Sequence, residues 1–174
     1  MRFETKHRIQ GTPSEVEQSL LDERYLDYLL KHHGILLEVQ LLEKKDDGDI
    51  LRRKVRYRPK PVIPSVGPKP VPPEWFAFVE SSSYDKRKRE LTFSNVPTTP
   101  KISKLLVNQG VLRIREAPGG QAERWLEGEI RLNLPFLLKP LAMIAERLIH
   151  AEGLKLLDGE VPVLNRFIAE VLRS

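Results

Sequence analysis

The period of the hydrophobic pattern changes along this chain, and that change limits the folds open to it. From about residue 35 to about residue 134, apolar and polar residues alternate with a period of two between turn residues, which predicts successive β-hairpins. From Pro140 to Leu172, apolar residues recur at helical spacing. A hairpin sheet with one apolar face needs a cover, and only this last segment is long enough to supply it.

The alternating region divides into three hairpins and one proline-rich interruption. Residues 59–73 hold seven of the fourteen prolines, which excludes a helix or a central strand and predicts an extended surface loop. The strand pairs expected on either side of this loop are 37–42 with 51–58, 74–83 with 88–94, and 107–116 with 123–134.

The chain opens with a strand and two short helices. Residues 2–9 alternate as a half-buried strand does. Thr12, Pro13 and Glu15 then stand where a helix N-cap, a first-turn proline and a capping-box acid belong. A second helix is predicted from Asp22 to His33, and Gly34 suits its end.

Size and composition indicate one globular domain spanning residues 1–174. Hydrophobic residues make up 40% and charged residues 30% of the 174-residue chain, which argues against a disordered or membrane-spanning protein. Cysteine is absent, which excludes disulfides, thiolate zinc sites and cysteine nucleophiles. No targeting segment is visible, so we expect a cytoplasmic protein. A net charge of +5 is modest for a dedicated nucleic-acid binder.

The predicted order is one strand, two short helices, about six further strands and a long C-terminal helix. The opening Met1–Val16, a strand leading to a proline-containing helix start, and the closing stretch Leu148–Leu172 carry a resemblance. The chain resembles the START-like helix-grip (pollen-allergen-like) superfamily, in a bacterial branch. That resemblance implies an α+β fold in which a curved antiparallel sheet of 6–7 strands wraps around the C-terminal helix.

The resemblance also implies a cavity between sheet and helix that holds a hydrophobic small molecule. A single helix covers only part of a curved sheet, so large apolar side chains must fill the remainder or leave a void. The alternative for every candidate is ordinary core packing. The candidate lining residues are Leu37, Val39, Val55, Tyr57, Phe76, Phe78, Glu80, Phe93, Leu112, Ile114, Leu126 and Ile130 from the sheet, and Leu157, Leu164, Phe167 and Ile168 from the helix.

Charged residues on the apolar side of a strand are the next signal. Arg53, Glu80 and Arg89 stand at such positions, and a buried ion there would anchor a ligand head group. The alternative is that they lie at strand ends, reach solvent or pair with each other. A shift of one residue in register reverses the interpretation for all three.

Motifs for nucleotide, metal or cofactor binding are missing. The chain has no glycine-rich phosphate loop and no hydrolase or zinc-protease motif. Its four histidines lack ligand spacing. We therefore predict no metal, no cofactor and no specific catalytic residue, although a histidine and a cavity glutamate would be enough for acid–base work.

A basic stripe marks one predicted strand. Arg52, Lys54, Arg56 and Arg58 share its outward face, which would suit an anionic partner such as a lipid head group or RNA. The alternative is a solvated face balanced by the outward acids Glu38, Glu127 and Glu129.

Three functions follow from these patterns. The first is the binding, and in some settings the transport, of a hydrophobic small molecule such as a lipid, a sterol or a polyketide, which needs no covalent chemistry. The second is a polyketide cyclase or dehydratase that uses the same cavity. The third is a non-catalytic interaction protein whose basic face makes transient contact with an anionic membrane surface.

Overall fold

The computed structural model describes residues 1–61, 65–66, 69–70 and 72–174. Seven of the described strands form one antiparallel sheet in the order β1-β9-β8-β7-β6-β3-β2, which is open because β1 and β2 are its edges. The strands of this sheet are β1 (Arg2–Ile9), β2 (Leu36–Asp46), β3 (Ile50–Pro59), β6 (Phe78–Asp85), β7 (Glu90–Pro97), β8 (Leu106–Ala117) and β9 (Gln121–Leu132).

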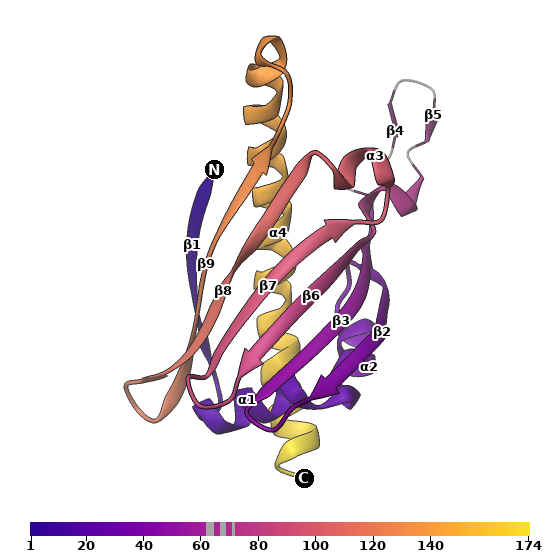
Figure 1. Ribbon diagram of the computed structural model, residues 1–174. Helices are drawn as coiled ribbons and strands as arrows, with labels where there is room; N and C mark the ends of the chain where they lie inside the picture. Colours follow the sequence, from indigo (N-terminus) through magenta and orange to yellow (C-terminus); the bar gives the residue numbers. More distant parts are fainter. Residues whose placement is uncertain (62–64, 67–68, 71) are drawn as a thin grey trace.

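The helices all lie on one side of the sheet or at its ends (Figure 1). The long helix α4 runs behind the strands, and α1 and α2 close the end at which α4 terminates. This is the α+β arrangement that the order of elements predicted. The helices are α1 (Pro13–Leu21), α2 (Glu23–His32), the short α3 (Pro100–Ser103), α4 (Lys139–Phe167) and the 3₁₀ and π segments η1 (Pro73–Phe76), η2 (Phe136–Leu138) and η3 (Ile168–Leu172).

Local signals set the two short helices as predicted. The hydroxyl of Thr12 accepts a hydrogen bond from the N–H of Glu15, while the Glu15 carboxylate accepts one from the N–H of Thr12. Asp22 caps α2 with one hydrogen bond, in which its carboxylate accepts the N–H of Arg24. Each cap satisfies N–H groups that a helix start leaves without a partner in the helix.

The dense part of the core lies at the C-terminal end of α4. Val163, Leu164, Phe167 and Ile168 are at most 6% exposed and pack with apolar side chains from α1, α2 and the sheet. The ring of Phe167 meets that of Tyr25 edge-on at 5.1 Å between centroids. Burial of this kind is the main favourable term in folding.

The opposite end of α4 is not covered. Ile144 and Leu148 belong to the apolar stripe expected to face the sheet, yet they are 65% and 40% exposed. The helix begins beyond the ends of the strands (Figure 1), so its first turns have no sheet to pack against. The expectation that the whole stripe covers the sheet is therefore wrong for its first part.

Two strand assignments also need correction. The register between β2 and β3 shifts between Leu36 and Glu38, so Leu36 packs on the core and Leu37 is 41% exposed. The strand expected to begin at residue 74 begins at Phe78, and Phe76 lies in η1 before it. A bulge and a 3₁₀ turn both break the period of two on which those assignments relied.

The proline-rich interruption contains a two-residue strand pair, β4 (Ser65–Val66) with β5 (Lys69–Pro70), set apart from the main sheet. Residues 62–64, 67–68 and 71 lie outside the described part of the chain. The prediction that no central strand crosses 59–73 holds for the described residues, since β3 ends at Pro59.

Candidate functional site

Six polar side chains meet on the concave face of the sheet, beneath α4. We call them the polar belt. Strand register brings Glu80 beside Val55 on β3 and Asn95 on β7, and Tyr57 lies two residues after Val55 on the same face. Hydrogen bonds join Tyr25, Arg124 and Glu160. The belt consists of Tyr25 of α2, Tyr57 of β3, Glu80 of β6, Asn95 of β7, Arg124 of β9 and Glu160 of α4.

Arg124 and Glu160 form the fixed end of the belt. Arg124 is 1% exposed; its guanidinium donates to the Glu160 carboxylate and, at 3.1 Å, to the carbonyl of Leu157. The hydroxyl of Tyr25 donates to the other Glu160 oxygen at 3.0 Å. Burial works to raise the pKa of Glu160, but the charge of Arg124 and these hydrogen bonds outweigh it and lower that pKa.

Glu80 has weaker support, a side-chain hydrogen bond with Ser82 and the more distant charge of Arg53. Burial raises the pKa of its carboxyl; the charge of Arg53 opposes this rise and the charge of Glu160 adds to it. Burial likewise raises the pKa of Tyr57 well above its usual value, and the negative charges of Glu80 and Glu160 act in the same direction. Burial also raises the pKa of Tyr25 well above its usual value. The site therefore favours the protonated forms of three belt groups, Glu80, Tyr57 and Tyr25.

The side-chain oxygen of Asn95 is buried and has no hydrogen-bond partner within the described residues. Asn95 stands directly opposite Glu80 in the β6–β7 register. A buried polar atom without a partner costs about 1–3 kcal/mol. This oxygen thus marks a place where a water or a ligand donor would lower the free energy.

Two glycines face each other across β8 and β9 next to the belt. Gly110 pairs with Gly128 in register. A Cβ on Gly110 would lie 2.8 Å from the ring of Phe93, and a Cβ on Gly128 would lie 2.6 Å from the ring of Phe3. Both rings therefore rest on bare backbone, in space that any side chain would take.

The structure distributes the predicted lining residues among three settings. Leu37 is exposed and Phe76 lies in η1, as described above. The half-buried set, on the concave face around the belt or on α4 facing it, is Tyr57, Phe78, Glu80, Phe93 and Leu157. The fully buried set, packed as core, is Val39, Val55, Leu112, Ile114, Leu126, Ile130, Leu164, Phe167 and Ile168.

Among the three charged residues expected at apolar positions, only Glu80 joins the belt. The guanidinium of Arg53 donates to the carbonyl of Leu20 at the end of α1, although its charge still acts on Glu80. Arg89 pairs with Glu17 of α1 at 3.2 Å. Both arginines thus fasten the sheet to α1.

The basic stripe is matched by acids, mostly on the neighbouring strand. Glu38 lies within 3.1 Å of Arg56 and 3.2 Å of Arg58, and Glu43 pairs with Lys54 at 2.8 Å. Arg52 pairs with Asp47. The balance comes from β2 and its turn rather than from Glu127 and Glu129, which lie across the sheet on β9.

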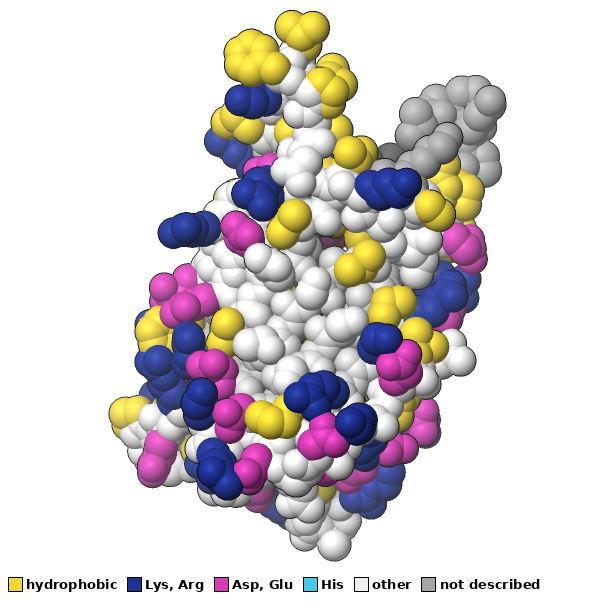
Figure 2. Space-filling view, in the orientation of Figure 1, with side chains coloured by type: hydrophobic (Ala, Val, Ile, Leu, Met, Phe, Trp, Pro, Cys, Tyr) yellow, Lys and Arg dark blue, Asp and Glu magenta, His cyan; other side chains and the backbone are white. Residues whose placement is uncertain are grey.

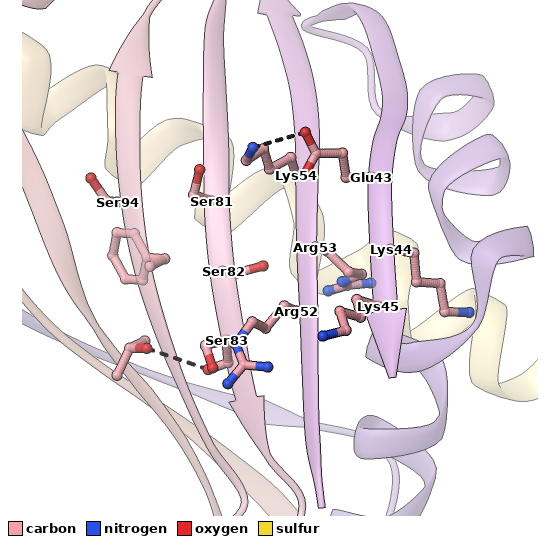
Figure 3. Close-up of a pocket in the computed structure, with 12 residues that line it drawn as sticks. Glu43, Lys44, Lys45, Arg52, Arg53, Lys54, Ser81, Ser82, Ser83 and Ser94 are labelled. Carbon is pink, nitrogen blue, oxygen red and sulfur yellow. Dashed lines mark hydrogen bonds and ion pairs between the residues drawn. The ribbon is translucent and has the colours of Figure 1, made fainter. Parts of the chain in front are cut away.

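An open depression of about 770 Å³ lies on the outer face of the sheet, away from α4 (Figure 3). Its floor is made by small hydroxyl side chains of β6 and β7, and long cationic side chains of β2 and β3 stand beside it. Those cations are already paired, including Lys44 with Glu23 and Lys45 with Asp47. Because its cations already have partners and the depression is open to solvent, we do not take it as the site.

Sequence reasoning missed four of the six belt residues: Tyr25, Asn95, Arg124 and Glu160. A signal for Arg124 was available, since it shares strand parity with the inward Leu126 and Ile130, the same argument that selected Glu80. Glu160 stands four residues before Leu164 and three after Leu157, which places it on the inward side of the helix. Asn95 shares parity with Phe93.

Comparisons with known proteins bear on the fold. No protein-family model matches the chain, and no curated protein matches it by sequence. Similar solved structures include the ZhuI aromatase/cyclase from Streptomyces sp. R1128, at 12% identity and a TM-score of 0.67 over 100% of this chain and 96% of that one. The protein TTHA0849 from Thermus thermophilus has 15% identity and a TM-score of 0.64 over 94% of this chain and 97% of that one.

A third similar structure is that of Ara h 8.0201, at 10% identity and a TM-score of 0.62 over 97% of each chain. All three likenesses extend over nearly the whole length of both proteins. At identities this low they establish the fold and leave the site to be argued from this chain's own residues.

Proposed function

We propose that this chain, which has the START-like helix-grip fold, binds a hydrophobic small molecule between the concave face of its sheet and α4. The ligand would lie against the half-buried aromatic side chains of Phe78 and Phe93, and its polar group would meet Glu80, Tyr57 and Asn95. In this arrangement apolar burial supplies affinity and a few polar groups supply orientation.

One observation carries the proposal. Tyr57, Glu80 and Glu160 keep accessible surface, and yet burial acts strongly on the pKa of each. The combination is expected of groups that face a small water-accessible space inside the fold, because water reaches them there while protein surrounds them.

The belt also favours one class of polar group. Tyr57 offers a hydroxyl donor, Asn95 offers an unpaired oxygen acceptor, and Glu80 in its protonated form offers both. Arg124, the buried cation, is already neutralised by Glu160. A hydroxyl or a carbonyl on an otherwise apolar ligand therefore fits this site better than a carboxylate or a phosphate.

A test of the proposal is to fill the space from the helix side. Leu157 lies half-buried against the core opposite the sheet, so Leu157→Trp places a large ring in it. We expect this variant to lose at least tenfold in affinity for the hydrophobic probe anilinonaphthalene sulfonate and to keep its stability within about 1 kcal/mol, since an open space accepts added volume.

The matched control is Leu42→Trp, at a 44% exposed position on β2, which should leave binding of the probe unchanged. Native mass spectrometry of the purified protein should also show a bound apolar molecule in the wild type and not in Leu157→Trp. A Leu157→Trp protein destabilised by about 1–3 kcal/mol, as overpacking produces, with unchanged probe binding would show that the space is already filled and would refute the proposal.

A second function is favoured by the raised pKa of Glu80. A carboxyl whose pKa is raised keeps its proton to higher pH than an exposed one and can act as a general acid, and the charge of Glu80 acts on the pKa of Tyr57. An aromatase or cyclase acting on a poly-ketone chain would use such a pair at a ketone oxygen. Turnover of a poly-ketone thioester by the wild type, lost in Glu80→Gln with binding retained, would establish this activity; binding without turnover would exclude it for that substrate.

A further inference from the structure

The end of the molecule at which α4 begins carries exposed apolar side chains that the fold does not use. We call them the apolar tip: Phe136, Leu137, Leu138, Met143, Ile144 and Leu148, between 40% and 88% exposed. Figure 2 shows hydrophobic side chains gathered on the part of the molecule that projects past the sheet. Contiguous exposed apolar surface of this kind marks an interaction site far more often than single exposed residues do.

The outward face of α4 changes character along its length. In the first turns the exposed positions include Met143, Ile144 and Leu148, whereas later they include Lys155 and Asp158. A helix with its outer face in water has the second pattern and not the first. The first turns therefore have the composition of a helix face that becomes buried against another surface.

Cations surround the apolar tip. Residues 131–148 contain three basic residues, Arg131, Lys139 and Arg147, and one acid, Glu146. The acid is turned inward, where it accepts the N–H of Leu132 at 2.8 Å. All three basic residues are exposed, and none forms an ion pair with any residue that the structure describes, in contrast to the matched cations of the basic stripe.

We propose that the apolar tip inserts into the head-group region of a membrane that contains anionic lipid, with Arg131, Lys139 and Arg147 at the phosphate level. Exposed phenylalanine and leucine beside lysine and arginine are the composition that interfacial segments use, and each cation near an anionic surface adds to the attraction. No described helix is long and apolar enough to cross the bilayer.

A second copy of the chain is the other occupant to consider, and the charges disfavour it. Two tips in contact would bring their unpaired cations together, and like charges facing each other across an interface oppose association. The tip also projects beyond the body of the protein (Figure 1). A projection meets a deformable lipid surface without needing a complementary groove.

The experiment is flotation of the full chain with vesicles of phosphatidylcholine alone or of equimolar phosphatidylcholine and phosphatidylserine. The wild type should float with the anionic vesicles, and less so at high salt because screening weakens the attraction. Leu137→Ser with Ile144→Ser should lower the partition coefficient about tenfold or more, since each removed side chain forfeits apolar burial. Lys139→Glu with Arg147→Glu should lower it at least as much on anionic vesicles.

The matched control is Leu42→Ser, at a 44% exposed position on β2, which should float as the wild type does. Equal flotation of the tip variants and the wild type would refute the proposal. Absence of flotation in the wild type, combined with a dimer in sedimentation that Leu137→Ser with Ile144→Ser dissociates, would assign the tip to self-association and would equally refute it. Neither result bears on probe binding by Leu157→Trp, so this proposal and the proposed function fail separately.

Discussion

The two ends of α4 belong to one continuous helix and behave as different kinds of surface. At the C-terminal end, Leu164 and Ile168 are fully buried and pack against α1, α2 and the sheet. At the N-terminal end, Met143 and Ile144 are also apolar and are 57% and 65% exposed. Apolar composition therefore does not decide burial in this helix; the presence of strands opposite each turn does. The polar belt lies between the two ends.

The prediction with the largest expected effect compares two phenylalanine-to-alanine substitutions, one at the buried end of α4 and one just before its exposed end. Phe167→Ala, at a 1% exposed position where the ring contacts Tyr25 and Tyr28, should lower the free energy of unfolding by about 3–5 kcal/mol, because it removes buried area and leaves a cavity. Phe136→Ala, at a 77% exposed position, should change it by less than about 0.5 kcal/mol. Urea denaturation measures both, and comparable losses would contradict the contrast.

The second test concerns the boundary between the two ends, where Glu160 meets Arg124. Glu160→Gln leaves a buried guanidinium without its counter-charge and should cost about 3 kcal/mol. The double variant Arg124→Met with Glu160→Met should recover most of that loss, since apolar replacement of both partners removes the unpaired charge. A double variant no more stable than the single one would show that the pair stabilises the fold beyond charge neutralisation.

The third and smallest effect concerns Glu80, across the interior from α4. Its pKa is raised above the ordinary value of 4.5, so between those two values the folded protein binds more protons than the unfolded chain. Stability should therefore fall as pH rises through this window. Glu80→Gln removes this dependence and should raise the free energy of unfolding at neutral pH by about 1 kcal/mol.

Urea denaturation at several pH values compares Glu80→Gln with the control Glu116→Gln, an exposed acid on β8. The control should follow the wild-type pH profile. A Glu80→Gln profile that also follows the wild type would show that Glu80 is solvated like a surface carboxylate, and the argument for an internal water-accessible space would fail with it.

The sequence predicted best what depends on neighbours along the chain. The capping box of Thr12 and Glu15 needs signals within a few residues, so local chemistry fixes it. The helix α2 ends near the predicted place, but Gly34 is not in the left-handed conformation that the C-terminal glycine signal implied. The order of hairpins and the single covering helix followed from the change of period. These features together were enough to predict the fold.

What the sequence left out depends on contacts between distant segments. The pairing of Arg124 with Glu160 joins β9 to α4, and although periodicity places each residue on an inward face, neither position indicates the other as its partner. The bulge that exposes Leu37 arises from pairing with β3 and leaves no mark in the alternation. The exposure of Ile144 depends on where the strands end, which its helical spacing does not contain.

The facing glycines of β8 and β9, Gly110 and Gly128, determine how much space is left between the sheet and α4 at the centre of the molecule. A Cβ on Gly110 would come within 2.3 Å of the backbone oxygen of Glu127, and a Cβ on Gly128 within 2.7 Å of the backbone oxygen of Gln109, in addition to meeting the rings of Phe93 and Phe3. One methyl group at either position would therefore push on a phenyl ring and on the neighbouring strand at once. The spacing of β8 and β9 and the seats of the two rings are thus set together, and neither can change without the other.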